Sequence, residues 1–176
     1  MSAALVIPRP AADEHDPYYG RYIDLVEGEL VPSLERGLSQ WLPRVRDLDE
    51  AGARHRYAPG KWSVKEVLGH IIDGERVFAY RALRFARKDT TPLPGFEENE
   101  WVPAGRFDRR PLPDLVAEYE VVRAATLAMF GSFDEDDLLQ RGKANDAIVS
   151  VRALAHIIAG HELHHVGLLK ERYGLA

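Results

Sequence analysis

One apolar stripe near the C-terminus of this sequence includes two histidines. From Ser150 to Tyr173 apolar residues recur with helical spacing, and the segment HELHH places His161 and His165 on that stripe. Residues four apart on an α-helix lie about 40° apart around the axis and roughly 6 Å apart along it. A helix that begins after the N-cap Ser150 and ends at Gly174 therefore presents both imidazoles on its buried face.

Three earlier segments show the same periodicity and predict three more helices. The first covers residues 30–48, and the second, residues 64–85, opens with a capping box formed by Ser63 and Glu66. The third begins near Pro113 and ends at Gly131 and Ser132. Because the clusters of β-branched residues are short and lie within helical patterns, we expect no sheet of consequence. The predicted fold is an all-α four-helix bundle.

The segments outside these helices divide the chain into a lead-in and one domain. Residues 1–27 are interpreted as an extended N-terminal lead-in, and residues 28–176 as the bundle domain. The link between the second and third helices, about residues 88–112, is long and rich in proline. A link of that length in a compact domain is usually functional, for instance as a lid over a site.

Composition narrows the classes of partner and chemistry. The net charge is −5, which argues against a nucleic-acid partner and against an anionic membrane surface. We see no apolar run long enough to cross a bilayer and no signal peptide in MSAALVIPRP, so the cytoplasm is the expected compartment. The chain has no cysteine, which excludes disulfides, cysteine zinc sites and a cysteine nucleophile.

Two histidines in one apolar seam favour metal ligation over a purely structural role. Each buried imidazole would otherwise need its own hydrogen-bonding partner, whereas one cation satisfies both. His70, beside Val67 on the second helix, is the best candidate for a third ligand, although its position alone equally fits a boundary histidine. Three imidazoles would leave one position open on a tetrahedral metal such as Zn, and Ni, Fe or Cu are equally compatible.

The other histidines carry weaker signals. His164 follows His161 at i+3 and is a fallback ligand. His156 is interpreted as structural or surface-exposed, and His15 and His55 lie in loop-like contexts.

The letters HELHH also match the zinc-protease motif H-E-x-x-H, with Glu162 as a general base. One class of these proteases needs a further acidic ligand well downstream, but only eleven residues follow His165. The extended metzincin pattern fails as well, because Leu168 and Glu171 stand where it requires Gly and His. We therefore do not favour the protease interpretation.

Three segments together resemble the DinB/YfiT-like superfamily of metal-binding four-helix bundles. They are KWSVKEVLGHIIDGE, LPGFEENEWVPAGR and RALAHIIAGHELHHVGLLKERY, and the resemblance covers about residues 28–173. In that family one His of the second helix and an H-x-x-x-H pair of the fourth hold a divalent metal. By motif position these residues are His70, His161 and His165, so the resemblance supports the third ligand.

The resemblance also implies an activity. Characterised relatives include bacillithiol transferases and mycothiol-dependent isomerases, so we expect a metal-dependent transferase that activates a low-molecular-weight thiol for attack on an electrophile. The expected cofactor is a divalent ion, Zn, Ni or Fe, and the expected partners are a small-molecule substrate and the thiol. A hydrolase that uses metal-bound water and a non-catalytic metal-binding stress-response protein are the alternatives. A homodimer is possible for a bundle of this kind.

Seven further side chains are candidates around such a site, and each also has an interpretation without a functional role. Trp62 is interpreted as a packing residue rather than a substrate contact, and Asp73 and Glu66 either as surface charges or as groups that orient the ring of His70. The segment 95–101 either covers the pocket or is an exposed acidic loop; it includes Glu97, Glu98 and Trp101. Arg123 could hold a substrate carboxylate or form a salt bridge.

Overall fold

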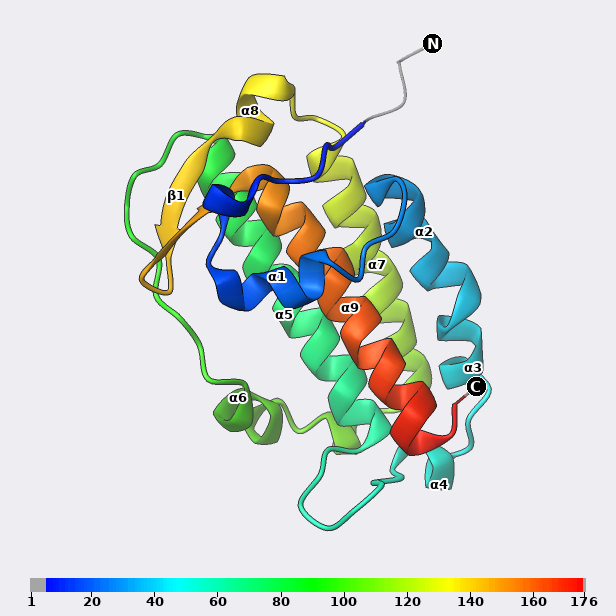
Figure 1. Cartoon of the computed structure of the whole chain (residues 1–176). Helices are drawn as coiled ribbons and strands as arrows, with labels where there is room; N and C mark the ends of the chain where they lie inside the picture. The colour runs from blue at the N-terminus through cyan, green and yellow to red at the C-terminus, as the bar shows by residue number, and fades with distance from the viewer. Residues whose placement is uncertain (1–5, 176) are drawn as a thin grey trace.

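The computed structural model describes residues 6–175, and four long helices dominate it (Figure 1). The all-α four-helix bundle predicted from the periodicity is confirmed. Within the described residues, no helix combines the length and apolarity needed to cross a membrane. The four helices of the bundle are α2 (Leu30–Gln40), α5 (Val64–Ala86), α7 (Leu112–Phe130) and α9 (Val151–Tyr173).

The predicted helix ends are confirmed for α5 and α9. The Ser63 hydroxyl accepts a hydrogen bond from the backbone N–H of Glu66, whose carboxylate accepts one from the Ser63 N–H. Ser150 caps α9, and Gly174 ends it with a left-handed φ of 71°. The end of α9 lies beside the start of α5, because the Tyr173 hydroxyl donates to the Trp62 carbonyl at 2.7 Å. The two helices therefore run antiparallel.

The single helix predicted over residues 30–48 is interrupted. It consists of α2 and a short α3 (Leu42–Arg46), with Trp41 between them, and α4 (Glu50–Ala53) follows. Pro43 explains the interruption, because its ring removes one backbone donor and crowds the carbonyl four residues earlier.

The extended lead-in predicted for residues 1–27 is wrong in part. After a 3₁₀ turn (Ala12–Glu14), residues Pro17–Ile23 form helix α1, which crosses α9 in Figure 1. The Asp16 carboxylate caps α1 by accepting from the Tyr18 N–H at 2.8 Å. A Cβ at Gly160 would lie 2.0 Å from the Tyr22 carbonyl oxygen, so glycine permits this close crossing. Residues 1–5 lie outside the described part of the chain.

The two links contain structure that the periodicity did not indicate. The long link carries α6 (Glu98–Gly105) and a 3₁₀ turn (Phe107–Arg109). The link between α7 and α9 carries α8 (Glu135–Leu139) and one short antiparallel hairpin, which agrees with the expectation of no sheet of consequence. Its strands are β1 (Arg141–Ala144) and β2 (Ala147–Ser150). Asn145 and Asp146 both have positive φ, 50° and 62°, as the tight turn of such a hairpin requires.

A polar layer divides the core of the bundle into two apolar parts. One part contains the apolar residues between positions 151 and 159 of α9 and between 78 and 86 of α5, and the other contains Val166 of α9 and the apolar residues between positions 64 and 72 of α5. Between them lie buried polar side chains from three helices: His70, Glu75, Arg123, His161, Glu162 and His165. Buried charges of this kind need partners, so this layer is where function is expected.

Candidate metal centre

The structure brings together the three histidines that the sequence predicted as ligands. His70 projects from α5, and His161 and His165 from successive turns of α9. All three side chains are buried, and one ring nitrogen from each lies within 4.8 Å of the others. Donors from two antiparallel helices meet inside the bundle, which is where four-helix bundles build metal sites.

Hydrogen bonding alone cannot satisfy this cluster. The His161 Nε2 lies 2.9 Å from Nε2 of His70 and 3.2 Å from Nε2 of His165. A nitrogen of a neutral imidazole is either a donor or an acceptor, so His161 Nε2 can form one good hydrogen bond but faces two nitrogens. A cation, in contrast, accepts the lone pairs of all three nitrogens. The donor set therefore fits a divalent metal.

The distances between the histidine ring nitrogens also fit a bound divalent metal. Zn–N bonds of about 2.0–2.1 Å at tetrahedral angles place nitrogens about 3.3–3.4 Å apart. The observed 2.9 and 3.2 Å are shorter by a few tenths of an ångström, which small ring movements can supply. Imidazole donors suit Zn, Ni and Fe.

Burial keeps the three imidazoles neutral, as metal ligands must be. Desolvation lowers the pKa of His70 to about 4 and that of His165 to about 2. The pKa of His161 is well below its ordinary value for the same reason, with added repulsion from His165. At neutral pH the lone pairs are free, so binding a metal there requires no proton to leave a histidine.

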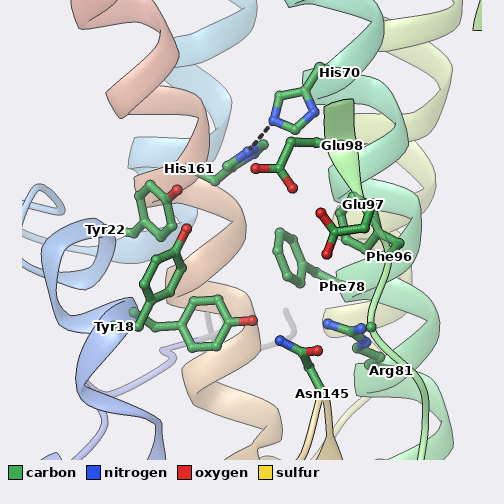
Figure 2. Close-up of a pocket in the computed structure, with 12 residues that line it drawn as sticks. Tyr18, Tyr22, His70, Phe78, Arg81, Phe96, Glu97, Glu98, Asn145 and His161 are labelled. Carbon is green, nitrogen blue, oxygen red and sulfur yellow. Dashed lines mark hydrogen bonds between the residues drawn. The ribbon is translucent and has the colours of Figure 1, made fainter. Parts of the chain in front are cut away.

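A pocket of about 320 Å³ opens onto one side of the histidines (Figure 2). His70 and His161 form its inner end, and Glu98 of α6 lies beside His70. Its walls carry both charge and hydroxyl groups. They include Tyr18, Tyr19, Tyr22, Arg81, Glu97 and Asn145.

Several of these wall residues were missed by the sequence analysis. Tyr18 and Tyr22 come from α1, in the segment interpreted as an extended lead-in, and Asn145 comes from the hairpin turn, which the periodicity did not indicate. The pair Asp16-Pro17, an N-cap followed by a first-turn proline, is the signal that could have revealed α1. Arg81 donates from Nη2 to the Pro94 carbonyl at 2.7 Å and so ties the loop to α5.

The loop residues predicted near the site divide into two groups. Glu97 and Glu98 line the pocket, as the covering-loop interpretation expects. Trp101 is 43% exposed and packs against Phe96, with ring centroids 4.8 Å apart.

Glu162 and Arg123 belong to the polar layer behind the histidines. Glu162 is buried and accepts hydrogen bonds from Trp41 Nε1 at 2.8 Å, from the Tyr119 hydroxyl at 2.7 Å and from Arg123. Arg123 is fully buried and also forms a bidentate pair with Glu75, at 2.9 and 2.8 Å. Arg123 is therefore not available to hold a substrate carboxylate, and its salt-bridged interpretation is confirmed.

The remaining candidates have packing or surface roles. Glu66 is engaged in the capping box and with Arg56, and Asp73 forms an ion pair with Arg76 at 3.9 Å. Trp62 is half-buried and packs on His70, with ring centroids 4.9 Å apart.

Two further histidines are placed by the structure. His164 is half-buried and packs against Tyr22, outside the cluster of three nitrogens. His156 is buried, and its Nδ1 pairs with the Arg152 carbonyl at 3.0 Å, so its role is structural.

Comparison with known proteins agrees with this architecture. YfiT from Bacillus subtilis, described as a probable metal-dependent hydrolase with an unusual four-helix bundle topology, superimposes with a TM-score of 0.69 at 15% identity. The match covers 95% of this chain and 94% of YfiT. A mycothiol-dependent maleylpyruvate isomerase matches with a TM-score of 0.64 at 13% identity, over 85% of this chain and 59% of the isomerase.

No curated protein matches the sequence significantly. The sequence model of the DinB superfamily, in contrast, matches residues 33–169, which include all three clustered histidines and most of the bundle. The chain therefore belongs to the DinB superfamily.

Proposed function

We propose that the chain binds one divalent metal ion through His70, His161 and His165, and that it is a metal-dependent transferase. The reaction would move a low-molecular-weight thiol onto an electrophilic small molecule. One observation carries the proposal: three buried, neutral imidazole nitrogens converge, and the rings of His70 and His161 line an open pocket. Zn, Ni and Fe all suit these ligands. The cytoplasm remains the predicted compartment of the protein, and a homodimer remains its predicted assembly.

The residues of this pocket have the roles that such a transfer needs. A divalent cation held by three histidines would lower the pKa of a bound thiol. The sulfur then forms a bond to the electrophilic carbon as the bond from that carbon to its leaving group breaks. The thiol proton can pass to Glu97 or Glu98, the carboxylates that line the pocket. Burial raises the pKa of Tyr22 to about 12, so its hydroxyl stays protonated and can donate to substrate.

The superfamily supports the involvement of a thiol. The isomerase that shares this fold is described as mycothiol-dependent, although the present chain spans only 59% of its length. The chain has no cysteine, so the thiol has to come from outside it.

Turnover with defined thiols tests the proposal. Metal-loaded protein is incubated with 1-chloro-2,4-dinitrobenzene and bacillithiol, mycothiol or glutathione, and formation of the thioether is followed by absorbance. We expect turnover with at least one thiol, and its loss in His161→Ala. His164→Ala is the matched control, because this neighbouring histidine lies outside the cluster. Failure with all three thiols, despite bound metal, would contradict the transferase proposal.

A metal-dependent hydrolase is the second candidate, because YfiT, which aligns over 94% of its length, is described as one. In that case the same metal-loaded protein hydrolyses an ester or amide probe without any thiol. Metal binding with neither activity would instead favour the non-catalytic, stress-response alternative.

A further inference from the structure

The histidine cluster is reached from a second side. A separate pocket of about 230 Å³ includes His165 in its lining, together with residues of the loop before α5, of α6 and of the last turns of α9. It shares no lining residue with the pocket at His70 and His161. The neighbouring residues Glu98 and Asn99 line different pockets, so the first turn of α6 separates the two openings.

The two pockets also lie at different levels of the bundle. The first contains Phe78 and Arg81 of α5, whereas the second contains Val67 of the first turn. The histidine cluster contributes His70 and His161 to the first pocket and His165 to the second, so it lies between the two.

Both pockets contain aromatic side chains, but they differ in charge. The first is lined by Arg81, Glu97 and Glu98, whereas the second is lined by Tyr57, Trp62, Leu168 and Tyr173 and has no carboxylate among the residues that the structure describes. The ring of Trp62 lies nearly parallel to that of His165, with 28° between the rings and centroids 6.5 Å apart, and Tyr57 meets Tyr173 edge to face at 5.1 Å. Flat aromatic molecules pack well on such faces and edges. Among the described lining residues, Lys61 alone carries a charge at neutral pH, and it is exposed.

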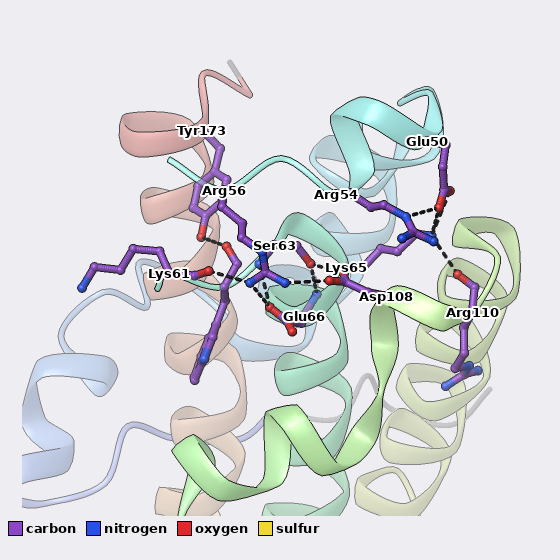
Figure 3. A network of polar contacts seen from close by, with 11 residues as sticks. Glu50, Arg54, Arg56, Lys61, Ser63, Lys65, Glu66, Asp108, Arg110 and Tyr173 are labelled. Atoms are coloured by element: carbon purple, nitrogen blue, oxygen red, sulfur yellow. Dashed lines mark hydrogen bonds and ion pairs between the residues drawn. The ribbon is translucent and has the colours of Figure 1, made fainter. Parts of the chain in front are cut away.

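The loop that forms this aromatic wall is fixed in place (Figure 3). Arg56 donates from Nη1 to the Lys61 carbonyl at 2.6 Å and to Glu66 at 2.5 Å, and from Nη2 to Asp108 at 2.6 Å. On the other side the Tyr173 hydroxyl holds the Trp62 carbonyl. A wall held in this way needs little ordering when a ligand binds, which favours affinity.

We infer that this second pocket binds a flat, aromatic reactant that carries an anionic group. Its ring lies against Trp62 and Tyr57, its reactive end points to His165, and its negative charge faces Lys61. The first pocket is then left for the polar reactant. The inference rests on the proposed function in assigning both molecules as reactants, but binding to the second pocket does not itself require the metal.

The test is a calorimetric titration of the metal-free protein with 4-nitrobenzoate. We expect saturable binding in the roughly millimolar range or tighter. Trp62→Ala should weaken it about tenfold or more, because it removes the main stacking face. Lys61→Gln should weaken binding of 4-nitrobenzoate but leave that of the neutral 4-nitrobenzyl alcohol unchanged. Trp101→Ala, an exposed tryptophan outside the pocket, is the matched control.

Leu168→Glu keeps the test valid if Trp62→Ala does not fold, because Leu168 is half-buried in the pocket wall and its replacement adds a repelling charge. Absence of binding, or binding that neither Trp62→Ala nor Leu168→Glu weakens, would overturn the inference. Because no metal is present, failure of the metal-binding proposal would leave this result unaffected. Conversely, if the protein binds metal but not 4-nitrobenzoate, the inference about the second pocket is contradicted, whereas the proposed metal site is not.

Discussion

At the scale of single residues, Gly74 sets how closely α5 approaches the ring of His161. A Cβ at this position would lie 2.9 Å from His161 Cε1, so an added methyl group displaces the imidazole. We predict that Gly74→Ala lowers metal affinity by about tenfold to a hundredfold, the range found when the support of a ligand is changed. Competition with a chromophoric chelator measures this affinity.

Gly167→Ala is the matched control for that change. Gly167 also lies in a helix of the site, but nothing lies within 4 Å of an added Cβ. This variant should retain wild-type metal affinity and gain up to about 1 kcal/mol of stability from the better helix former. Equal metal affinities for the two alanine variants would contradict the proposed role of Gly74.

The neutral histidines predict how stability depends on pH. The pKa of His70 is about 4 in the folded protein and 6.5 as an ordinary value. Between these pH values the unfolded chain binds a proton that the metal-free folded protein excludes. The free energy of unfolding therefore falls as pH falls from 6.5 towards 4, by up to about 1.4 kcal/mol per pH unit for such a group. Above pH 6.5 this contribution is constant.

Urea unfolding of the metal-free protein at several pH values measures this slope. His70→Gln removes one titrating group and should give a shallower loss of stability over the same window. If wild type and His70→Gln lost equal free energy of unfolding between pH 6.5 and pH 4, protonation of His70 would not be the cause of the pH dependence.

The sequence could predict part of this site at residue scale, for physical reasons. The i, i+4 spacing placed His161 and His165 on one face because both lie on one helix. His70 is close to them only through the packing of α5 on α9. Its position in the sequence therefore left its role as the third ligand open, and the family resemblance supplied that role. Arg81 and Asn145 line the same pocket from separate elements, which no local pattern reports.

At the scale of elements, Arg123 joins three helices of the bundle. It bonds Glu75 of α5, Glu162 of α9 and the Leu34 carbonyl of α2. We predict that Arg123→Met destabilises the protein by about 3–5 kcal/mol, because two buried carboxylates lose their counter-charge. Urea unfolding monitored by circular dichroism measures the change.

A combined variant separates lost charge compensation from lost packing. Replacing all three ionised groups, as Glu75→Leu, Arg123→Met and Glu162→Gln, removes the uncompensated charges. The amide oxygen of the introduced glutamine keeps an acceptor for Trp41 and Tyr119. It should recover at least half of the stability that Arg123→Met alone loses. A triple variant as unstable as the single one would assign the loss to packing.

The long helices were predictable from sequence because amphipathic periodicity and caps are local signals. The interruption at Trp41 follows from Pro43, and α1 begins with an N-cap and a proline, so both were accessible in principle. Helix α6 has no such signal: its N-cap Glu97 makes no side-chain capping bond, and Pro103 lies within it. Its position depends on packing against α5 and could not be predicted locally.

At the scale of the whole molecule, the polar layer makes metal binding and folding interdependent. The three imidazoles lie between the two apolar parts of the core, and they converge only when α5 and α9 are packed. A metal that binds only this folded arrangement stabilises it, by about 2.7 kcal/mol at a free metal concentration one hundred times Kd.

For a chain of this length that stabilisation raises the unfolding midpoint by roughly 5–10 °C. Scanning calorimetry of the metal-loaded and chelator-treated protein measures the difference, which should disappear in His165→Ala. A midpoint that is the same with and without metal would contradict the linkage between the site and the fold.

The metal content of the purified protein tests the central claim most directly. Protein prepared without an affinity tag is loaded with Zn²⁺, freed of excess metal and analysed by native mass spectrometry. We predict about one ion per chain for wild type and for His164→Ala, and none for His70→Ala, His161→Ala or His165→Ala, since three nitrogens are the minimum for a site of this kind. Wild-type protein that binds no ion, or an ion that survives in these three variants, would contradict the assignment of the histidine cluster as a metal centre.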